Sequence, residues 1–220
     1  MRGALLLAAA LALAGCAPGG AEEAPGRVAV DRAARAVSFP ATVHQDAFHR
    51  RVLGMPGYHL VVWRDGSAAP AALFRAAVTD IQVLDALESL GAKPGNALGM
   101  ESWDERENPH SRAPEQVIAG PPVEVLVRVP GRRKPLRLAD ILEDPGHRGF
   151  AMHFGGHRAN IPEWHSGCVV CLYSCPGSKV GNAAYTVRDW VEGTTRFRVR
   201  RGVLPPDGTA VHIVLRLLER

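Results

Sequence analysis

Three of the four cysteines of this 220-residue chain lie in one short segment, and no other feature restricts the possible folds as strongly. The segment reads Gly167-Cys168-Val169-Val170-Cys171-Leu172-Tyr173-Ser174-Cys175-Pro176. Thiols spaced C-x2-C-x3-C can share a metal ion or a cluster, exchange a disulfide, or line one face of a helix. A helix is disfavoured because the segment carries two β-branched valines and is bracketed by glycine and proline. We therefore expect a cysteine-bearing loop.

The N-terminus has the organisation of an export signal rather than of a folded segment. Arg2 precedes an apolar run over residues 5–14, which is too short to span a membrane as a helix. The run ends in Leu13-Ala14-Gly15-Cys16, which resembles the lipobox of bacterial lipoproteins. That resemblance implies a signal peptide at 1–15 and attachment of palmitate-type acyl chains to Cys16. The protein would then be anchored to a membrane in the cell envelope, facing an extracytoplasmic space, the periplasm in a Gram-negative cell.

Lipid attachment changes the count of available thiols. If Cys16 carries lipid, three cysteines remain, and an odd number cannot all pair within one chain. A framework built from disulfides alone is therefore excluded. Residues 16–26 are rich in glycine, proline and alanine, so we expect them to form a flexible tether to a single globular domain over 27–220.

Strand-like segments dominate that domain, because alternating or β-branched apolar residues recur between Gly- and Pro-containing turns. The expected strands cover 27–31, 36–43, 58–63, 123–129, 150–154, 184–190, 195–199 and 210–218. Residues 71–78 fit either a hairpin partner of 58–63 or the start of a helix.

The clearest helical pattern covers about 79–91, where Ile81, Leu84 and Leu87 recur at three-residue steps. Thr79 or Asp80 is a suitable N-cap, and a glycine ends the pattern. A short helix is expected at 138–142. These elements predict an α+β fold with a mainly antiparallel sheet, one prominent helix at about 79–91 and the cysteine-bearing loop.

The cysteine spacing has a chemical interpretation as a set of ligands. A C-x2-C turn directs two sulfurs to one side, and the third cysteine extends the same cup. The run matches the last three cysteines and the proline of the bacterial ferredoxin pattern C-x2-C-x2-C-x3-C-P. His165 stands where the first cysteine of that pattern would be, and His153 and His157 are weaker candidates for a fourth ligand. The candidate metal and cofactor ligands are Cys168, Cys171 and Cys175.

Several separated motifs make the chain similar to the YdjY-domain family of bacterial envelope proteins. These motifs are Gly-Cys-Val-Val-Cys-x3-Cys-Pro with the upstream Phe154-Gly155-Gly156, Leu90-Gly91-Ala92-Lys93-Pro94-Gly95-Asn96, and Val203-Leu204-Pro205-Pro206-Asp207-Gly208-Thr209. The resemblance covers most of residues 27–218. It implies a ferredoxin-like protein in which Cys168, Cys171 and Cys175 bind a 4Fe-4S cluster. Because the spacing itself lacks a fourth cysteine, an external ligand or a three-iron cluster is the alternative to a histidine ligand. The resemblance implies no particular reaction.

The export signal favours a state of the three cysteines other than an iron–sulfur cluster. It lacks the Arg-Arg pair of the route by which iron–sulfur proteins are exported already folded. Zinc avoids this difficulty, and so does a Cys168–Cys171 disulfide with Cys175 free, because disulfides persist in the envelope.

Composition and motifs exclude other functions. The formal charge is only +4, and the arginines are spread along the chain rather than concentrated in one patch, so we expect no nucleic-acid partner. No phosphate-binding glycine loop, G-x-S-x-G or H-E-x-x-H occurs, and we assign no catalytic residues. The leading hypothesis is an anchored electron-transfer or redox-sensing protein with an unidentified partner. The alternative is a non-catalytic binding or scaffold lipoprotein with a structural zinc or disulfide at the same turn.

Overall fold

The structure is a computed structural model that describes residues 26–50, 56–96, 98–99, 101–104, 115–156, 158–159, 161–193 and 195–219. The expected signal peptide, Cys16 and most of the expected tether lie outside these residues. Among the described residues, no helix is long and apolar enough to cross a membrane.

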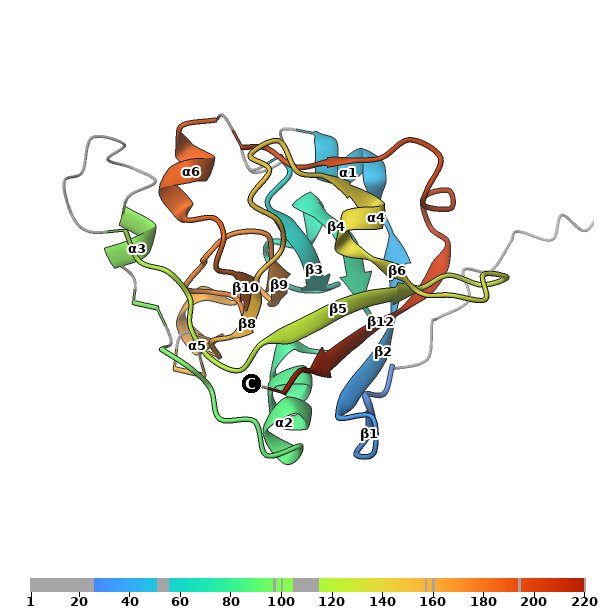
Figure 1. Cartoon of the computed structure of the whole chain (residues 1–220), viewed down its shortest axis with the longest axis horizontal. Coiled ribbons are helices and arrows are strands. Elements are labelled where there is room, and N and C mark those ends of the chain that lie inside the picture. Colours follow the sequence, from blue (N-terminus) through green and yellow to red (C-terminus); the bar gives the residue numbers. More distant parts are fainter. Residues whose placement is uncertain are drawn as a thin grey trace, which may run out of the picture.

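Most of the regular structure is β-strand (Figure 1). The strands are β1 (Ala29–Asp31), β2 (Ala36–Val43), β3 (His59–Trp63), β4 (Ala72–Ala76), β5 (Val123–Arg128), β6 (Leu136–Arg137), β7 (Leu142–Glu143), β8 (Met152–Phe154), β9 (Cys168–Cys171), β10 (Val180–Asn182), β11 (Arg198–Val199) and β12 (Ala210–Leu217). The helices are α1 (Gln45–His49), the 3-10 turn η2 (Ala69–Ala71), α2 (Asp80–Ser89), α3 (Glu101–Asp104), α4 (Leu138–Ile141), α5 (Ile161–Trp164) and α6 (Val187–Val191).

The main sheet has the order β6-β5-β12-β2-β4-β3-β9-β10-β8, with β1 paired to β2, while β7 and β11 form a separate small sheet. Two neighbouring pairs, β3/β4 and β9/β10, are parallel, and the other pairs are antiparallel. A bridge between Pro122 and His153 brings the β8 edge back toward the start of β5. The sheet is therefore mixed and curls into a half-barrel (Figure 1).

The predicted fold class, α+β with a mainly antiparallel sheet, one prominent helix and a cysteine-bearing loop, is wrong. The helix itself forms as α2, with Thr79 and Gln82 making the expected capping box and Gly91 following at φ 81°. It has ten residues, the other helices among the described residues have five or fewer, and none of them dominates the fold. Cys168 and Cys171 lie at the two ends of β9, in the sheet rather than in a loop.

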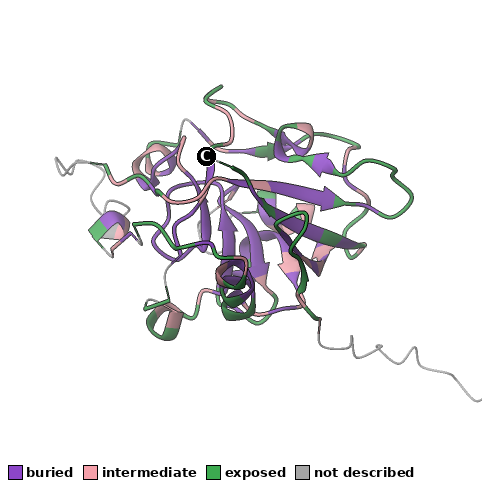
Figure 2. Cartoon of the chain, turned by 60° about the horizontal axis from the view of Figure 1, so that its bottom comes forward, coloured by how far each residue is buried: buried purple, intermediate pink, exposed green. Residues whose placement is uncertain are grey.

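Burial follows the position of each strand in the sheet (Figure 2). The long strands β2 and β12 alternate between buried and more exposed residues, as expected for strands with one face toward the core. In contrast, β9 is buried at every position, and β3 is buried except at Trp63. These two neighbouring strands are covered on both faces, and their burial explains why their sequences are apolar at every position except His59.

Two local predictions are corrected by the structure. The segment 184–190, expected as a strand, contains α6, which begins at a Thr186–Asp189 capping box. The undecided segment 71–78 forms β4, which pairs with β3 in parallel and is reached through η2, so the two strands do not make a hairpin.

Candidate functional site: a histidine and two thiols in the core

The pairing of β9 with β3 brings two cysteines to the same side of a strand. In a regular strand, residues three apart point to opposite faces of the sheet. Here Val62 pairs with Cys168 and Val61 with Val170, so β9 contributes one extra residue between the two pairs. A β-bulge of this kind reverses the alternation. Cys168 and Cys171 consequently face the same way, and their Sγ atoms lie at disulfide distance.

A second irregularity in the same pair of strands places His59 beside both sulfurs. Between the Val61–Val170 pair and the His59–Cys171 pair, β3 contributes the extra residue. The Nδ1 atom of His59 lies 3.5 Å from the Sγ of Cys168 and 3.7 Å from the Sγ of Cys171. All three residues are buried, with exposed fractions of 5%, 1% and 0% respectively.

Two glycines allow the strands to approach at the entrance to β9. Gly167 has φ 68°, a conformation that disfavours side chains, and its carbonyl accepts a 2.8 Å hydrogen bond from the backbone of Trp63. A Cβ atom added at Gly167 would lie 2.8 Å from the Cα of Gly66. The C-terminal end of β3 and the start of β9 thus pack too tightly for a side chain directly before Cys168.

The third cysteine has a different environment. Cys175 is a free, buried thiol in the connection from β9 to β10, and Tyr58 and Lys179 are its polar neighbours. The Nζ of Lys179 lies 2.7 Å from a carboxylate oxygen of Asp80, and both side chains are almost fully buried. Burial raises the pKa of the Cys175 thiol, and its hydrogen bond with Tyr58 and the charge of Lys179 oppose that rise. The thiol is therefore held in its neutral form.

The structure separates the residues that the sequence pattern grouped. Cys168 and Cys171 come together, whereas Cys175 lies outside the compact group of metal-type ligand atoms found among the described residues. His165 is exposed, at φ 46°, and is not in the group either. The Nδ1 of His153 lies 2.9 Å from the Gly120 carbonyl oxygen, and His157 lies outside the described residues.

No motif in the sequence links His59 to the cysteines, which lie more than a hundred residues away along the chain. One signal was present. His59 lies within Tyr-His-Leu-Val-Val-Trp, where all the remaining residues are apolar or aromatic. A histidine in such a run is a buried polar group that needs a partner, although the run does not identify that partner.

The group has two chemical states. When Cys168 and Cys171 are oxidised, their sulfurs are bonded to each other and are not available as thiolates. When they are reduced, two thiolates and an imidazole nitrogen form a compact donor set that suits a thiophilic ion such as zinc or copper(I). A 4Fe-4S cluster takes four cysteine ligands. Only two thiols are in the group, so it suits a single ion better than a cluster.

Comparison with known proteins agrees with the sequence motifs. The model of the YdjY domain matches residues 28–216 of the chain. Among curated proteins, the uncharacterized protein YdjY of Escherichia coli (strain K12) is 30% identical over 162 residues, which cover 73% of this chain and 68% of that protein. No solved structure matches the chain.

Proposed function

The chain belongs to the YdjY-domain family, and from that premise we propose that it is a lipid-anchored envelope protein with a redox-switched site for a thiophilic metal ion. The ligands are His59, Cys168 and Cys171. The observation that carries the proposal is the contact of one imidazole nitrogen with both sulfurs of a pair at disulfide distance.

The switch is a two-electron reaction between the two sulfurs. Reduction breaks the Cys168–Cys171 bond and takes up two electrons and two protons, which a dithiol partner supplies while its own sulfurs form a disulfide. Loss of the two thiol protons then gives the thiolates that bind the metal. Oxidation reverses both steps and releases the ion. An electron-transfer or redox-sensing role follows, because metal occupancy reports the redox state of the surroundings.

His59 has a defined part in this proposal. Zinc in proteins takes four ligands, and two thiolates with one imidazole leave a fourth position for a small ligand such as water. In the oxidised state, the His59 imidazole remains packed against the disulfide, so the third ligand is already placed when the bond breaks. Little rearrangement of β3 is then needed for metal binding.

The first experiment measures metal and thiol content together. Full-length protein is purified without oxygen, reduced, and analysed for zinc, copper and iron, while an oxidised sample is weighed by mass spectrometry. We expect about one equivalent of zinc or copper(I) in the reduced protein. The oxidised protein should bind no metal and be lighter by two hydrogens.

Matched variants identify the ligands. His59→Ala and Cys168→Ser should abolish metal binding, whereas Cys175→Ser should retain it. Iron with visible charge-transfer absorbance that disappears in Cys175→Ser would replace this proposal with an iron–sulfur cluster. The disulfide could instead resist reductants that reduce ordinary protein disulfides. That result would favour the structural alternative, a binding or scaffold protein in which the disulfide stabilises β9.

The anchor is tested separately, because it rests on the N-terminal motif alone. Cells supplied with labelled palmitate should incorporate the label into the wild-type chain, and the protein should sediment with membranes. Cys16→Ser should lose both properties. A wild-type chain that is unlabelled and released by salt alone would show that the segment is an ordinary secretory signal.

A further inference from the structure

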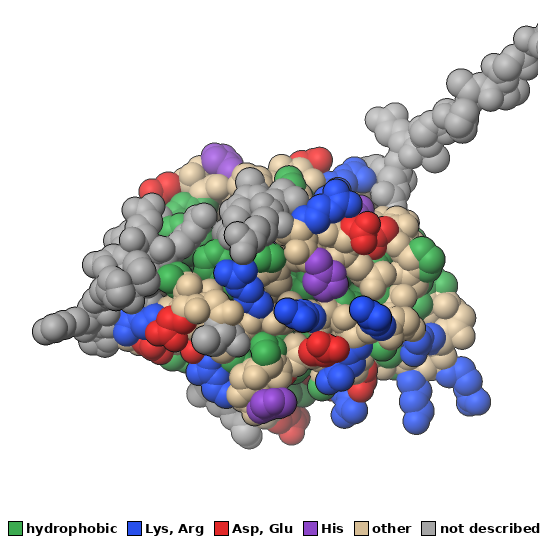
Figure 3. Space-filling view, turned by 90° about the horizontal axis from the view of Figure 1, so that it is seen from above, with side chains coloured by type: hydrophobic (Ala, Val, Ile, Leu, Met, Phe, Trp, Pro, Cys, Tyr) green, Lys and Arg blue, Asp and Glu red, His purple; other side chains and the backbone are tan. Residues whose placement is uncertain are grey.

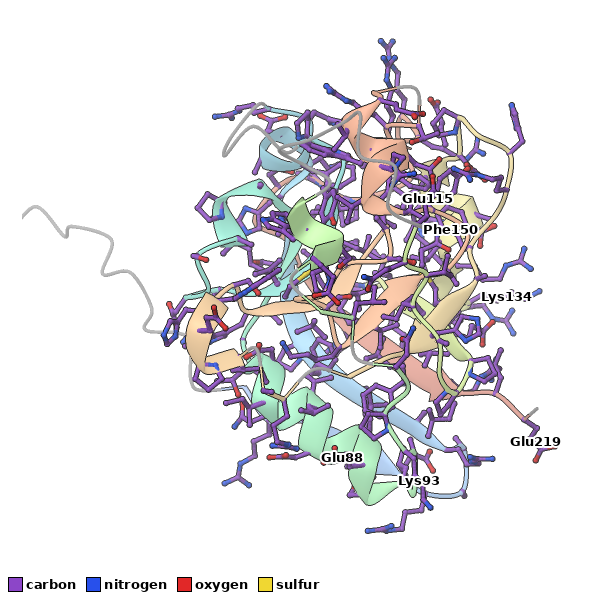
Figure 4. The ribbon with its side chains drawn as sticks, turned by 90° about the vertical axis from the view of Figure 1, so that its left-hand side faces the viewer. Glu88, Lys93, Glu115, Lys134, Phe150 and Glu219 are labelled. Atoms are coloured by element: carbon purple, nitrogen blue, oxygen red, sulfur yellow. A yellow bond between two sulfur atoms is a disulfide. The ribbon has the colours of Figure 1, made fainter. Side chains whose placement is uncertain are left out.

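A second candidate site lies on the segment that follows α6, at the top of Figure 1, and it involves none of the cysteines. Arg196, Arg198 and Arg200 alternate with two residues, Phe197 and Val199, that are buried in the core. Because successive side chains of an extended chain point to opposite sides, the three guanidinium groups share one side. The ring of Phe197 packs 5.5 Å from that of Phe150, labelled in Figure 4, so the inward side of the segment is anchored.

These arginines line a cavity of about 680 Å³, together with Glu143, Asp144 and His147. That volume is within the usual range for sites that bind small molecules. The Asp144 carboxylate is engaged by the Tyr185 hydroxyl and by the backbone amides of Gly146 and Gly149. Glu143 pairs in register with Arg198 across the β7–β11 sheet. The Nε of Arg200 donates a hydrogen bond to the Ala139 carbonyl oxygen.

Arg196 is half-buried, whereas Arg198 and Arg200 are exposed. The guanidinium carbon of Arg196 lies 5.8 Å from the centre of the Trp190 ring, which supports the group from one side. Its Nε atom is buried and has no hydrogen-bond partner among the described residues. Among the described residues, none of the three arginines forms an ion pair, whereas Arg148, Arg158 and Arg216 each reach a carboxylate.

We propose that this cavity binds a small organic anion through a carboxylate or phosphate group held by Arg196, with Arg198 and Arg200 contributing charge. A guanidinium group offers parallel N–H donors that match the two oxygens of such a group. Because the Arg196 Nε atom is itself buried, the terminal N–H groups of the guanidinium are the donors that an anion in the cavity would reach. On the face seen from above in Figure 3, lysine and arginine side chains lie among aspartate and glutamate side chains. The three arginines that line the cavity supply the local positive field that attracts an anion.

The test is a calorimetric titration of the full-length protein with citrate and, separately, with inorganic pyrophosphate, using glucose as a neutral control. We expect saturable one-site binding of at least one anion and none of glucose. Arg196→Gln should weaken binding by about tenfold or more, because a charge-assisted bidentate contact is lost. Arg128→Gln removes the same charge from an exposed residue of β5 that does not line the cavity, and should change affinity less than about twofold.

A second measurement does not depend on the folding of a variant. In the wild-type protein, the Arg196 Nε–H resonance should shift with the same dissociation constant as the calorimetric signal. Preference for citrate or for pyrophosphate would identify the group that is recognised. Absence of saturable binding by both anions overturns the proposal, as does an equal loss of affinity in Arg128→Gln and Arg196→Gln, which would indicate diffuse attraction rather than a site.

Discussion

At the scale of the residue, the core contains an ion pair as well as thiols. Lys179 and Asp80 have exposed fractions of only 2% and 6%, and the ammonium group also donates to the Gly177 carbonyl. Burial lowers the pKa of Lys179, and the charge of Asp80 opposes that effect. The pair fixes the start of α2 against the connection that carries Cys175.

Removing one partner of this pair should lower the free energy of unfolding far more than removing both partners. Lys179→Met leaves a buried carboxylate without a counter-charge, and we expect the free energy of unfolding to fall by about 3–5 kcal/mol. Adding Asp80→Asn to Lys179→Met should restore most of that loss. The comparison is Arg137→Met at the exposed Arg137–Asp140 pair, which should cost less than about 1 kcal/mol. Urea denaturation measures all four proteins, and equal losses in the single and double variants would contradict the expectation.

Cys175 should make stability depend on pH in the alkaline range. Its pKa is raised by burial, so the unfolded chain releases the thiol proton first as pH increases. The contribution is fully present below the unfolded pKa of about 8.5 and is lost above it, by up to about 1.4 kcal/mol per pH unit. Urea denaturation from pH 7 to 10 should therefore show a steeper decline for the wild type than for Cys175→Ala. Parallel curves would mean that the buried thiol ionises as easily as a free one.

Some residues of the candidate site are predictable from the sequence and others are not. The C-x2-C spacing identified two thiols that the structure places together, because both belong to one short segment. His59 could not be assigned to them, since their contact depends on strand pairing and on two irregularities in register. A ferredoxin pattern predicts a ligand at His165, whereas the structure places this residue on the surface, outside the group.

At the scale of the element, local patterns were informative where one face of an element is solvated. The alternation in 36–43, 123–129 and 210–218 predicted strands that the structure contains as β2, β5 and β12. The segment 184–190 failed because its apolar residues suit either state. The feature that distinguishes a helix from a strand here is the Thr186–Asp189 capping box, and the spacing of apolar residues does not reveal it.

Gly167 offers a test of the β3–β9 junction. Both Gly167 and Gly131 have positive φ, but a Cβ atom added at Gly167 would meet the neighbouring strand. A Cβ atom added at Gly131 would meet no atom of the described residues within 4 Å. Gly131→Ala should therefore cost about 1 kcal/mol for its backbone conformation alone. Gly167→Ala should cost roughly 1–3 kcal/mol more, because overpacking is added to that strain. Thermal unfolding of both variants measures the difference, and equal losses would show that the junction relaxes easily.

At the scale of the whole molecule, the mixed sheet explains why the fold class was mispredicted. Parallel pairing of β3 with β4 requires a crossover, yet the intervening η2 is only three residues and leaves no long helical signal. The connection from β9 to its parallel neighbour β10 also contains no helix. Because neither parallel connection contains a long helix, the sequence pattern of strands and turns resembles that of a protein with an antiparallel sheet.

The redox state should decide whether metal stabilises the whole protein. A ligand that binds only the folded state raises the free energy of unfolding by about 2.7 kcal/mol when its concentration is a hundred times the dissociation constant. Zinc should give a stabilisation of this size in the reduced protein. It should give none in the oxidised protein, whose sulfurs are bonded to each other.

Thermal unfolding with zinc or with a chelator, before and after reduction, measures this coupling. His59→Ala should remove the effect of zinc while leaving the disulfide intact, and Cys175→Ser should keep it, since Cys175 lies outside the ligand group. Equal stabilisation of the oxidised and reduced wild type would place the zinc elsewhere on the protein. Loss of the effect in Cys175→Ser would mean that the reduced core rearranges to a three-thiolate site.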